Sequence, residues 1–422
     1  MQAFRGRLPR RAVAGMLAAT CLMAVAQSAY AQVAPPFATL LRESEDAPRL
    51  AVSEAGVRQA EGLRDQARAR PNPSINVMTE NVAGSSPYSG FGRAETTLQY
   101  SQPIELGGKR SARIAAGEAG VVASRARDRD ARVVFAYDLA RAYAAAEIGD
   151  RRVGLAEDEV EEAQSDLKAA EALVGAGKET RLRALQARSA LNEVSAQLDL
   201  AKANRISAYV RLSALVGADA PFASLAESLL DTGPSPDMVG PVDPTASPAL
   251  LVAEAERAAA ARRLDVESRR ATPDITASVG VRRLEYEGAT AVLGGVTIPL
   301  HLFDRNRGNI AASRAEVDAA EARLAVLRAE ARAEAQSAAA ERSAAESRVT
   351  AARGALATAD ETYRLARIAY EAGKSPLVEL LAARHGLGTA RSTVLDAETA
   401  RFEARARLAR LAGRTITGEP IQ

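Results

Sequence analysis

The stretch YSQPIELGGKRSARIAAGEAG, from Tyr100 to Gly120, decides the fold. It begins with the alternation of a β-strand and ends as a charged helix, with Pro103, Gly107 and Gly108 between the two. Proline cannot donate to a β-ladder and glycine permits a sharp turn, so a strand ends here and the chain turns into a helix. The same order returns in VTIPLHLFDRNRGNIAASRAEV, from Val296 to Val317.

These two stretches belong to an internal duplication, which is the first feature to look for in a long chain. The separation of Pro103 and Pro299 is 299 − 103 = 196 residues, and Gly177 and Gly373 have the same separation. Further upstream the offset becomes 200, as at Pro73 and Pro273. The slip of four residues lies between Pro73 and Pro103 and belongs in a loop, since loops tolerate changes of length.

Each copy is predicted to consist of a helix, two strands and two long helices. In the first copy the leading helix is expected from about Ala47 to Ala69, and in the second it starts at Ser247-Pro248. The predicted domains are a signal peptide at 1–31, a first repeat at 32–217, a linker at 218–247, a second repeat at 248–413 and a C-terminal tail at 414–422. Strands are predicted at about 74–82, 94–104, 274–283 and 291–300, and long helices at about 109–174, 179–216, 305–371 and 376–412.

The segment 1–31 is typical of an export signal. Four arginines precede an apolar stretch from Ala12 to Ala26, and Ala29-Tyr30-Ala31 fits the cleavage pattern of signal peptidase. Cys21, the only cysteine, lies within this segment, so cleavage after Ala31 leaves no thiol. Lipidation at Cys21 is the alternative that the sequence leaves open.

The charge balance gives no basic footprint for nucleic acid. The formal net charge is +2, and removal of four signal arginines brings it to about 2 − 4 = −2. Arginines and glutamates are set among many alanines, which favours long helices with charged faces. No run of 18 apolar residues follows residue 31, so no membrane-spanning helix is expected there.

The predicted strands alternate with a period of two over about ten residues. Ile75, Val77 and Thr79 share one face of the first strand, and Val292 and Val296 share a face of the last. This pattern and length are typical of a transmembrane β-strand. A half-buried soluble sheet fits the strands equally well.

The long helices favour the membrane interpretation. No proline interrupts the segment from about Lys109 to Val174, which as a helix would extend roughly 100 Å. Such a helix must pack along others as a coiled coil or tube. Four strands cannot close a barrel, and an open edge cannot face lipid, so several copies of the chain must combine their strands. Three copies would supply 3 × 4 = 12 strands, with room for a lumen.

The motifs SQPIELGGKRSARIAAGEA and IPLHLFDRNRGNIAASRAE resemble the paired signatures of TolC-type outer membrane efflux proteins. The QPIELGGKR form is similar to the CzcC-like cobalt-zinc-cadmium branch, which serves heavy-metal resistance. The resemblance covers about Pro48 to Gly413, in both copies. It implies a mainly α-helical homotrimer with a 12-stranded transmembrane β-barrel continued by a periplasmic α-helical barrel.

The resemblance also implies a passive exit duct without catalysis or cofactor. Its partners would be outer membrane lipid, a periplasmic adaptor (membrane fusion protein) and an inner membrane RND-type pump. The helix turns would form the periplasmic tip where adaptor hairpins dock. The residues that match this tip are Val174, Gly175, Gly177, Thr180 and Leu182 in the first copy, and Ala372, Gly373, Ser375 and Leu377 in the second.

The tip constriction of the family uses a tyrosine, an arginine and acidic residues. Tyr370 and Glu379 match the tyrosine and one acid, whereas Ser375 stands at the arginine position and Arg183 at the acid of the first copy. We therefore expect a different closing network, in which Arg183 and Glu379, equivalent positions in the two copies, pair across neighbouring hairpins. Two solvated helix charges are the simpler alternative.

No metal site is predicted in the wall of the duct. Only His301 and His385 are present, without a cysteine partner or a neighbouring histidine. The predicted cargo is heavy-metal cations, and drugs or other small molecules are the alternative. A soluble periplasmic coiled-coil adaptor is the alternative of another class, although adaptors usually carry one hairpin rather than two in tandem.

Overall fold

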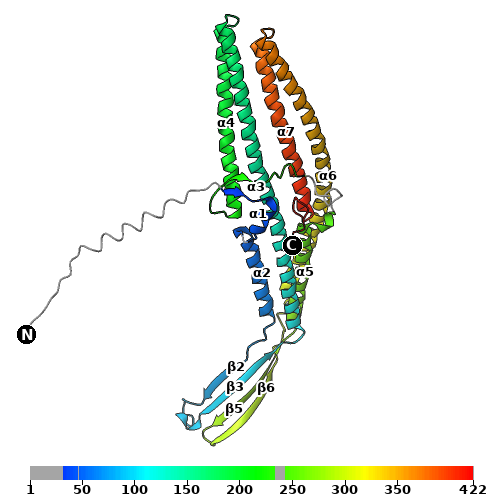
Figure 1. Cartoon of the computed structure of the whole chain (residues 1–422). Helices are drawn as coiled ribbons and strands as arrows, with labels where there is room; N and C mark the ends of the chain where they lie inside the picture. Colours follow the sequence, from blue (N-terminus) through cyan, green and yellow to red (C-terminus); the bar gives the residue numbers. More distant parts are fainter. Residues whose placement is uncertain (1–31, 46, 233–242, 422) are drawn as a thin grey trace, which may run out of the picture. The chain divides into compact units, whose positions relative to one another are not determined.

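The computed structural model describes residues 32–45, 47–232 and 243–421. The predicted signal peptide and Cys21 lie outside the described residues, as does the middle of the predicted linker. The two long-helix hairpins and the strands appear in the expected order (Figure 1).

Both copies contain the predicted series of elements. The first copy consists of α2 (Pro48–Ala67), β2 (Ser74–Glu80), β3 (Glu95–Ile104), α3 (Lys109–Gly175) and α4 (Arg181–Val216). The second consists of α5 (Pro248–Arg270), β5 (Ile275–Leu284), β6 (Ala289–Thr297), α6 (Arg307–Glu371) and α7 (Leu377–Leu411). Pro48 and Pro248 occupy first-turn positions, where the missing N–H costs no hydrogen bond.

The duplication extends to individual contacts. Arg132 on α3 forms an ion pair with Glu54 on α2 at 2.8 Å. At the same two offsets in the second copy (328 − 132 = 196 and 254 − 54 = 200), Arg328 forms an ion pair with Glu254 at 2.9 Å. The offsets read from the sequence therefore relate equivalent pairs of side chains in space.

The four long strands form one antiparallel sheet in the order β2-β3-β5-β6. The central pairing, β3 with β5, joins the two copies, and its register places Ile104 opposite Ile275 and Leu98 opposite Val281. Strands β2 and β6 are the two edges of this sheet.

The last strand ends earlier than predicted. The sequence pattern favours a strand over 291–300, but β6 spans Ala289–Thr297 and the residues from Ile298 to Leu300 carry no ladder. In the first copy the equivalent residues, at the end of β3, pair with β5. In the described part of the chain β6 pairs with β5 alone, so the alternation at 298–300 has no partner strand there.

By its contacts the chain divides into two compact units, each of which contains parts of both copies. The first unit covers 32–44, 142–231 and 359–392 among the described residues. It holds α1 (Phe37–Glu43), α4, the end of α3, and the turn that connects α6 to α7. Its core includes the buried side chains of Phe37, Tyr143 and Leu212.

The first unit also holds a short parallel pairing of β1 (Gln32–Ala34) with β4 (Phe222–Leu225). The short elements β1, α1 and β4 were not predicted from the sequence, and β4 lies inside the range predicted as linker. The ring of Phe37 meets that of Tyr143 edge-on, with 6.3 Å between the centroids. These contacts fix the start of the described chain against α3.

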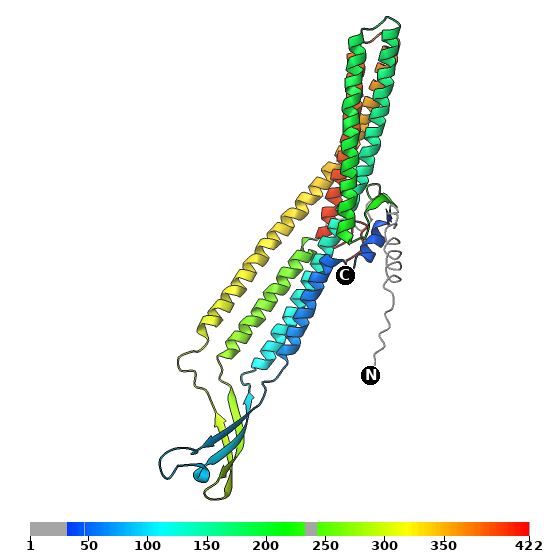
Figure 2. The ribbon, with the colours of Figure 1, turned by 90° about the vertical axis from the view of Figure 1, so that its left-hand side faces the viewer.

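The second unit contains the four-stranded sheet and the helices that leave it. In Figure 2 its helices lie side by side in the order α2, α3, α5, α6, which is the order of their strands. Contacts agree with this order, since Arg127 on α3 pairs with Glu256 on α5 at 2.7 Å and Arg257 on α5 pairs with Glu321 on α6 at 2.8 Å. None of the described helices is both long and apolar enough to cross a bilayer.

Candidate channel wall and docking turns

The sheet of the second unit has two chemically different faces. One face presents an exposed apolar surface that runs across the four strands in register. Its members include Ile75, Val77, Leu98, Tyr100, Val279, Val281 and Val292, whose exposed fractions range from 43% to 77%. An exposed apolar face of this extent marks contact with a membrane or another protein.

The opposite face of the sheet is polar. Arg282 on β5 donates to the hydroxyl of Thr97 at 3.0 Å and forms ion pairs with Glu95 at 2.9 Å and Glu80 at 3.4 Å. A strand that is apolar on one face and charged on the other fits a wall between lipid and water. The half-buried soluble sheet does not fit, because no described segment covers the apolar face.

The two helix turns of the first unit have the same backbone conformation. Gly177 and Gly373 both have left-handed backbones, with φ of 70° and 67°. The N–H of Lys178 donates to the carbonyl of Leu173 at 2.9 Å, and the equivalent bond joins Lys374 to Ala369 at 2.8 Å. Glycine adopts this left-handed conformation without strain, so each long helix can end and reverse within a few residues.

Most of the predicted docking residues lie in or beside these turns. Val174 and Gly175 end α3, Gly177 and Thr180 lie in the first turn, and Leu182 is 60% exposed in α4. Ala372, Gly373 and Ser375 form the second turn, before α7. Leu377 differs, because its side chain is fully buried and in this conformation offers nothing to a docked protein.

The structure brings together only part of the predicted constriction. Tyr370 is buried and lies near Glu179 and Arg183 of the other hairpin; its pKa is raised by burial and by Glu179, and Arg183 opposes the shift. Arg183 itself contacts Gln186 at 3.1 Å and Glu179 at 4.0 Å. Glu379 is exposed and accepts a hydrogen bond from the hydroxyl of Ser375. Within one chain Arg183 and Glu379 therefore have local partners instead of each other.

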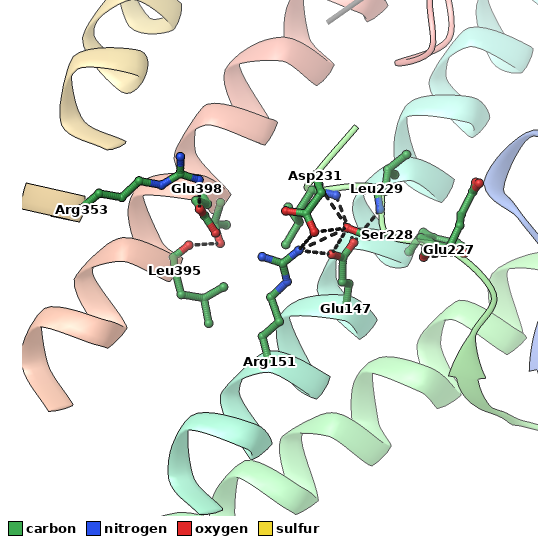
Figure 3. A network of polar contacts seen from close by, with 12 residues as sticks. Glu147, Arg151, Glu227, Ser228, Leu229, Asp231, Arg353, Leu395 and Glu398 are labelled. Atoms are coloured by element: carbon green, nitrogen blue, oxygen red, sulfur yellow. Dashed lines mark hydrogen bonds and ion pairs between the residues drawn. The ribbon is translucent and has the colours of Figure 1, made fainter. Parts of the chain in front are cut away.

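A buried carboxylate that the sequence analysis missed holds the segment after α4. Glu147 on α3 accepts hydrogen bonds from the N–H groups of Leu229 and Leu230 at 2.7 and 3.1 Å, and from the hydroxyl of Ser228 at 2.6 Å (Figure 3). Arg151, one turn along α3, donates to Glu147 at 2.7 Å and to Asp231 at 2.6 Å. The available sequence signal was the carboxylate of Glu147 directly after the three alanines in AYAAAEIGD.

A second missed cluster connects the two hairpins of the first unit. Asp166 on α3 is almost fully buried and accepts a hydrogen bond from the hydroxyl of Tyr363 on α6 at 3.2 Å. Arg384 on α7 lies 3.7 Å from the same carboxylate. Asp166 lies on the same face of α3 as the buried residues Ala163 and Ala170. A charged residue on an alanine-rich helix face was therefore the sequence signal for this cluster.

Each histidine has a hydrogen-bond contact that involves a backbone carbonyl. The Nδ1 of His301 is 3.0 Å from the carbonyl oxygen of Ala271, and His385 accepts the Thr389 hydroxyl at its backbone carbonyl. Among the described residues no group of three or more His, Cys, Asp or Glu side chains has an arrangement that could hold a metal ion.

Comparison with known proteins identifies the chain's relatives. The chain is 40% identical over 394 residues to the nickel-cobalt-cadmium resistance protein NccC of Alcaligenes xylosoxydans xylosoxydans, covering 93% of this chain and 90% of NccC. It is 41% identical over 320 residues to the nickel and cobalt resistance protein CnrC of Cupriavidus metallidurans, covering 75% of each. The cobalt-zinc-cadmium resistance protein CzcC of the same organism is 30% identical over 360 residues, covering 84% of each.

Solved structures share the fold at low identity. The outer membrane protein VceC of Vibrio cholerae superimposes with a TM-score of 0.74 at 20% identity, covering 90% of this chain and 96% of VceC. The outer membrane channel CmeC of Campylobacter jejuni gives a TM-score of 0.73 at 16% identity, covering 92% of this chain and 87% of CmeC. The predicted mainly α-helical fold with a small β part is confirmed.

The model of the family described as "Outer membrane efflux protein" matches residues 42–218 and 245–414, which is once in each copy. The alternative of a soluble periplasmic adaptor is wrong, because both copies match a channel family. The resemblance to the CzcC-like branch is confirmed by the relatives. The chain belongs to the outer membrane efflux protein family, as a transport duct of the outer membrane with its helices in the periplasm rather than an enzyme.

Proposed function

We propose that this protein is the exit duct of a tripartite efflux system that exports heavy-metal cations. An RND-type pump in the inner membrane and a periplasmic adaptor are its partners. The observation that carries the proposal is the 40% identity to a nickel-cobalt-cadmium resistance protein over 93% of the chain. Two further relatives are named for resistance to nickel, cobalt, zinc or cadmium.

Three chains form the duct in this proposal. The described residues supply four strands to this sheet and leave both of its edges open, which a bilayer does not tolerate. The exposed apolar face, the polar opposite face and the unpaired end of β6 support closure by neighbouring copies. Twelve strands would leave a lumen, whereas eight would be filled by side chains.

The duplication also predicts the strand register between neighbouring chains. Within one chain, β3 of the first copy pairs with β5 of the second copy, and Ile104 lies opposite Ile275. The two sequence offsets give the equivalent pair between neighbouring chains, in which Leu300 (104 + 196) of one chain lies opposite Ile75 (275 − 200) of the next. The same offsets place Ile298 opposite Val77. Both pairs keep the apolar side chains on the same face of the sheet.

The turns of the first unit are the proposed docking surface for the adaptor. The two turns share one conformation and expose glycine, small side chains and Leu182, which suits the close approach of another helical hairpin. Pairing of Arg183 with Glu379 of a neighbouring copy remains our proposal for the closed tip. Both side chains are accessible enough for such a contact, since Glu379 is exposed and Arg183 half-buried.

Deletion of the gene tests the proposed cargo. Tolerance to nickel, cobalt, zinc, cadmium and copper is measured in parallel with a panel of drugs. We expect a loss of tolerance to one or more of the metals that returns on complementation. Unchanged tolerance to every metal, with sensitivity to drugs instead, would assign the duct to drugs or other small molecules.

A further inference from the structure

The first unit contains an unusual concentration of incompletely bonded polar groups. Among the described residues, five buried side-chain atoms make no hydrogen bond to a protein group. They belong to Glu162, Asp166, Tyr370, Arg384 and Arg391. Buried polar atoms are nearly always paired in folded proteins, so an unpaired group requires an explanation.

Four of these residues lie together between the two hairpins and form what we call the seam: Glu162, Asp166, Arg384 and Arg391. Glu162 on α3 contacts Arg391 on α7 at 2.9 Å, and Asp166, one turn further along α3, faces Arg384. The distance between Arg384 Nε and Asp166 Oδ2 is 3.7 Å, which is too long for a hydrogen bond. The seam therefore joins α3 to α7 through ion pairs that leave one polar atom of each side chain unsatisfied.

The environment of Asp166 penalises its charge. Burial raises the pKa of Asp166 to about 6, although Arg384, the Tyr363 hydroxyl and Arg367 act in the opposite direction and Glu162 adds to the increase. These are the charged and titratable groups that face Asp166 from α7, from α6 and from its own helix. Arg367 is also held by Glu371 at 3.0 Å, so it is not free to approach Asp166.

We propose that Asp166 is a proton-responsive clasp that holds the first hairpin against the second. The protonated side chain needs no counter-charge and stays in the seam at low cost. The ionised side chain favours separation of α3 from α6 and α7, because separation returns the carboxylate to water. The seam lies on the helices whose turns carry the proposed docking residues, so the clasp sets how firmly these turns are held together.

The sign of the pH dependence follows from proton linkage. In the packed hairpins the carboxyl binds its proton at a pKa of about 6, whereas a separated, solvated aspartate has its ordinary value of 3.8. Protons therefore bind roughly a hundredfold more tightly to the packed state. Packing is stabilised as the pH falls through 6 toward 4, and this stabilisation is lost as the pH rises. Between pH 8 and pH 5 the packing equilibrium should change about tenfold.

Hydrogen–deuterium exchange of the full chain in detergent tests the clasp. Exchange is measured at pH 5, 6, 7 and 8, corrected for the intrinsic chemical rate at each pH, in peptides covering 359–371 and 377–392. In the wild type we expect protection about tenfold higher at pH 5 than at pH 8, with the increase beginning near pH 6. Peptides of α2 in the second unit should show no such change.

Two variants and a matched control isolate the carboxylate. Asp166→Asn is neutral and still accepts from Tyr363, so its protection should be high and independent of pH. Asp199→Asn removes an exposed carboxylate from α4 and should behave as the wild type. Arg384→Gln removes the facing cation, so the rise in protection should begin at a higher pH than in the wild type.

Several results would overturn the clasp. They are a wild type without pH dependence, an Asp166→Asn chain that keeps the tenfold change or loses protection at every pH, or a rise in Arg384→Gln that begins at the same pH as in the wild type. The measurement requires neither pump nor cargo. Its outcome is therefore independent of the proposed metal export.

Discussion

At the scale of single residues, two buried carboxylates on α3 differ in how completely their oxygens are hydrogen-bonded. Glu147 has four hydrogen bonds, from two backbone N–H groups, a hydroxyl and a guanidinium. Asp166 has one hydrogen bond and a distant cation. A fully bonded buried charge fixes a structure, whereas a partly bonded one makes the arrangement sensitive to conditions. We therefore assign Glu147 to stability and Asp166 to the clasp.

Removal of the Glu147 side chain should destabilise the first unit. Glu147→Ala leaves the buried N–H groups of Leu229 and Leu230 without their acceptor, which we expect to cost about 3 kcal/mol. Glu147→Gln keeps one carbonyl oxygen as acceptor and should cost about 1 kcal/mol. Thermal unfolding of the purified full chain measures both. Equal melting temperatures for Glu147→Ala and the wild type would show that the network does not hold the segment after α4.

At the scale of elements, close helix packing depends on particular glycines of α3. A Cβ added at Gly117 would lie 2.9 Å from the Cα of Arg64 on α2, and one at Gly149 would lie 3.1 Å from the Cα of Arg205 on α4. Backbone atoms cannot move aside as the end of a flexible side chain can. These glycines therefore set the spacing between α3 and its neighbours.

Alanine substitutions at two glycines one turn apart separate packing from helix propensity. Gly117→Ala should destabilise the chain by about 1–3 kcal/mol, because the methyl group overpacks the contact with α2. Gly120→Ala meets no atom within 4 Å and should be neutral or up to about 1 kcal/mol stabilising, since alanine favours the helix. Denaturant unfolding compares the two. A stabilising Gly117→Ala would contradict the close α2–α3 approach.

At the scale of the whole molecule, the repeat that occurs twice in the chain supports the proposed closure of the duct by several chains. The equivalent ion pairs Arg132–Glu54 and Arg328–Glu254 show that the copies pack alike. In the proposed trimer, the contact between the two repeats inside the chain is therefore the template for the contact between chains. The shortened β6 is the place where this template lacks its second strand.

Cysteine cross-linking tests the proposed register between chains. The only native cysteine is Cys21, within the predicted signal, so introduced pairs report alone. Ile298→Cys combined with Val77→Cys should form disulfide-linked trimers under mild oxidation, detected on a non-reducing gel. Thr297→Cys with Val77→Cys is the matched control, because residue 297 points to the opposite face of the strand. Linkage of the control pair instead would show that the register is wrong.

The sequence by itself determined the duplication, the order of elements and the family. Periodicity, proline and glycine act over a few residues, so their effects can be predicted without tertiary structure. The strands, the long helices and the turns at Gly177 and Gly373 follow from these local signals. The end of a strand is less local. The alternation at 298–300 predicted β-structure that one chain cannot pair.

Only the tertiary structure decided which charged side chains matter. Glu147 and Asp166 are ordinary acids in two alanine-rich helical stretches, and their burial depends on partners 81 and 197 positions away. Tyr370 and Leu377, predicted for the constriction and for docking, are both buried, which their local sequence did not indicate. Burial and charge pairing are long-range properties, and local sequence patterns carry little information about them.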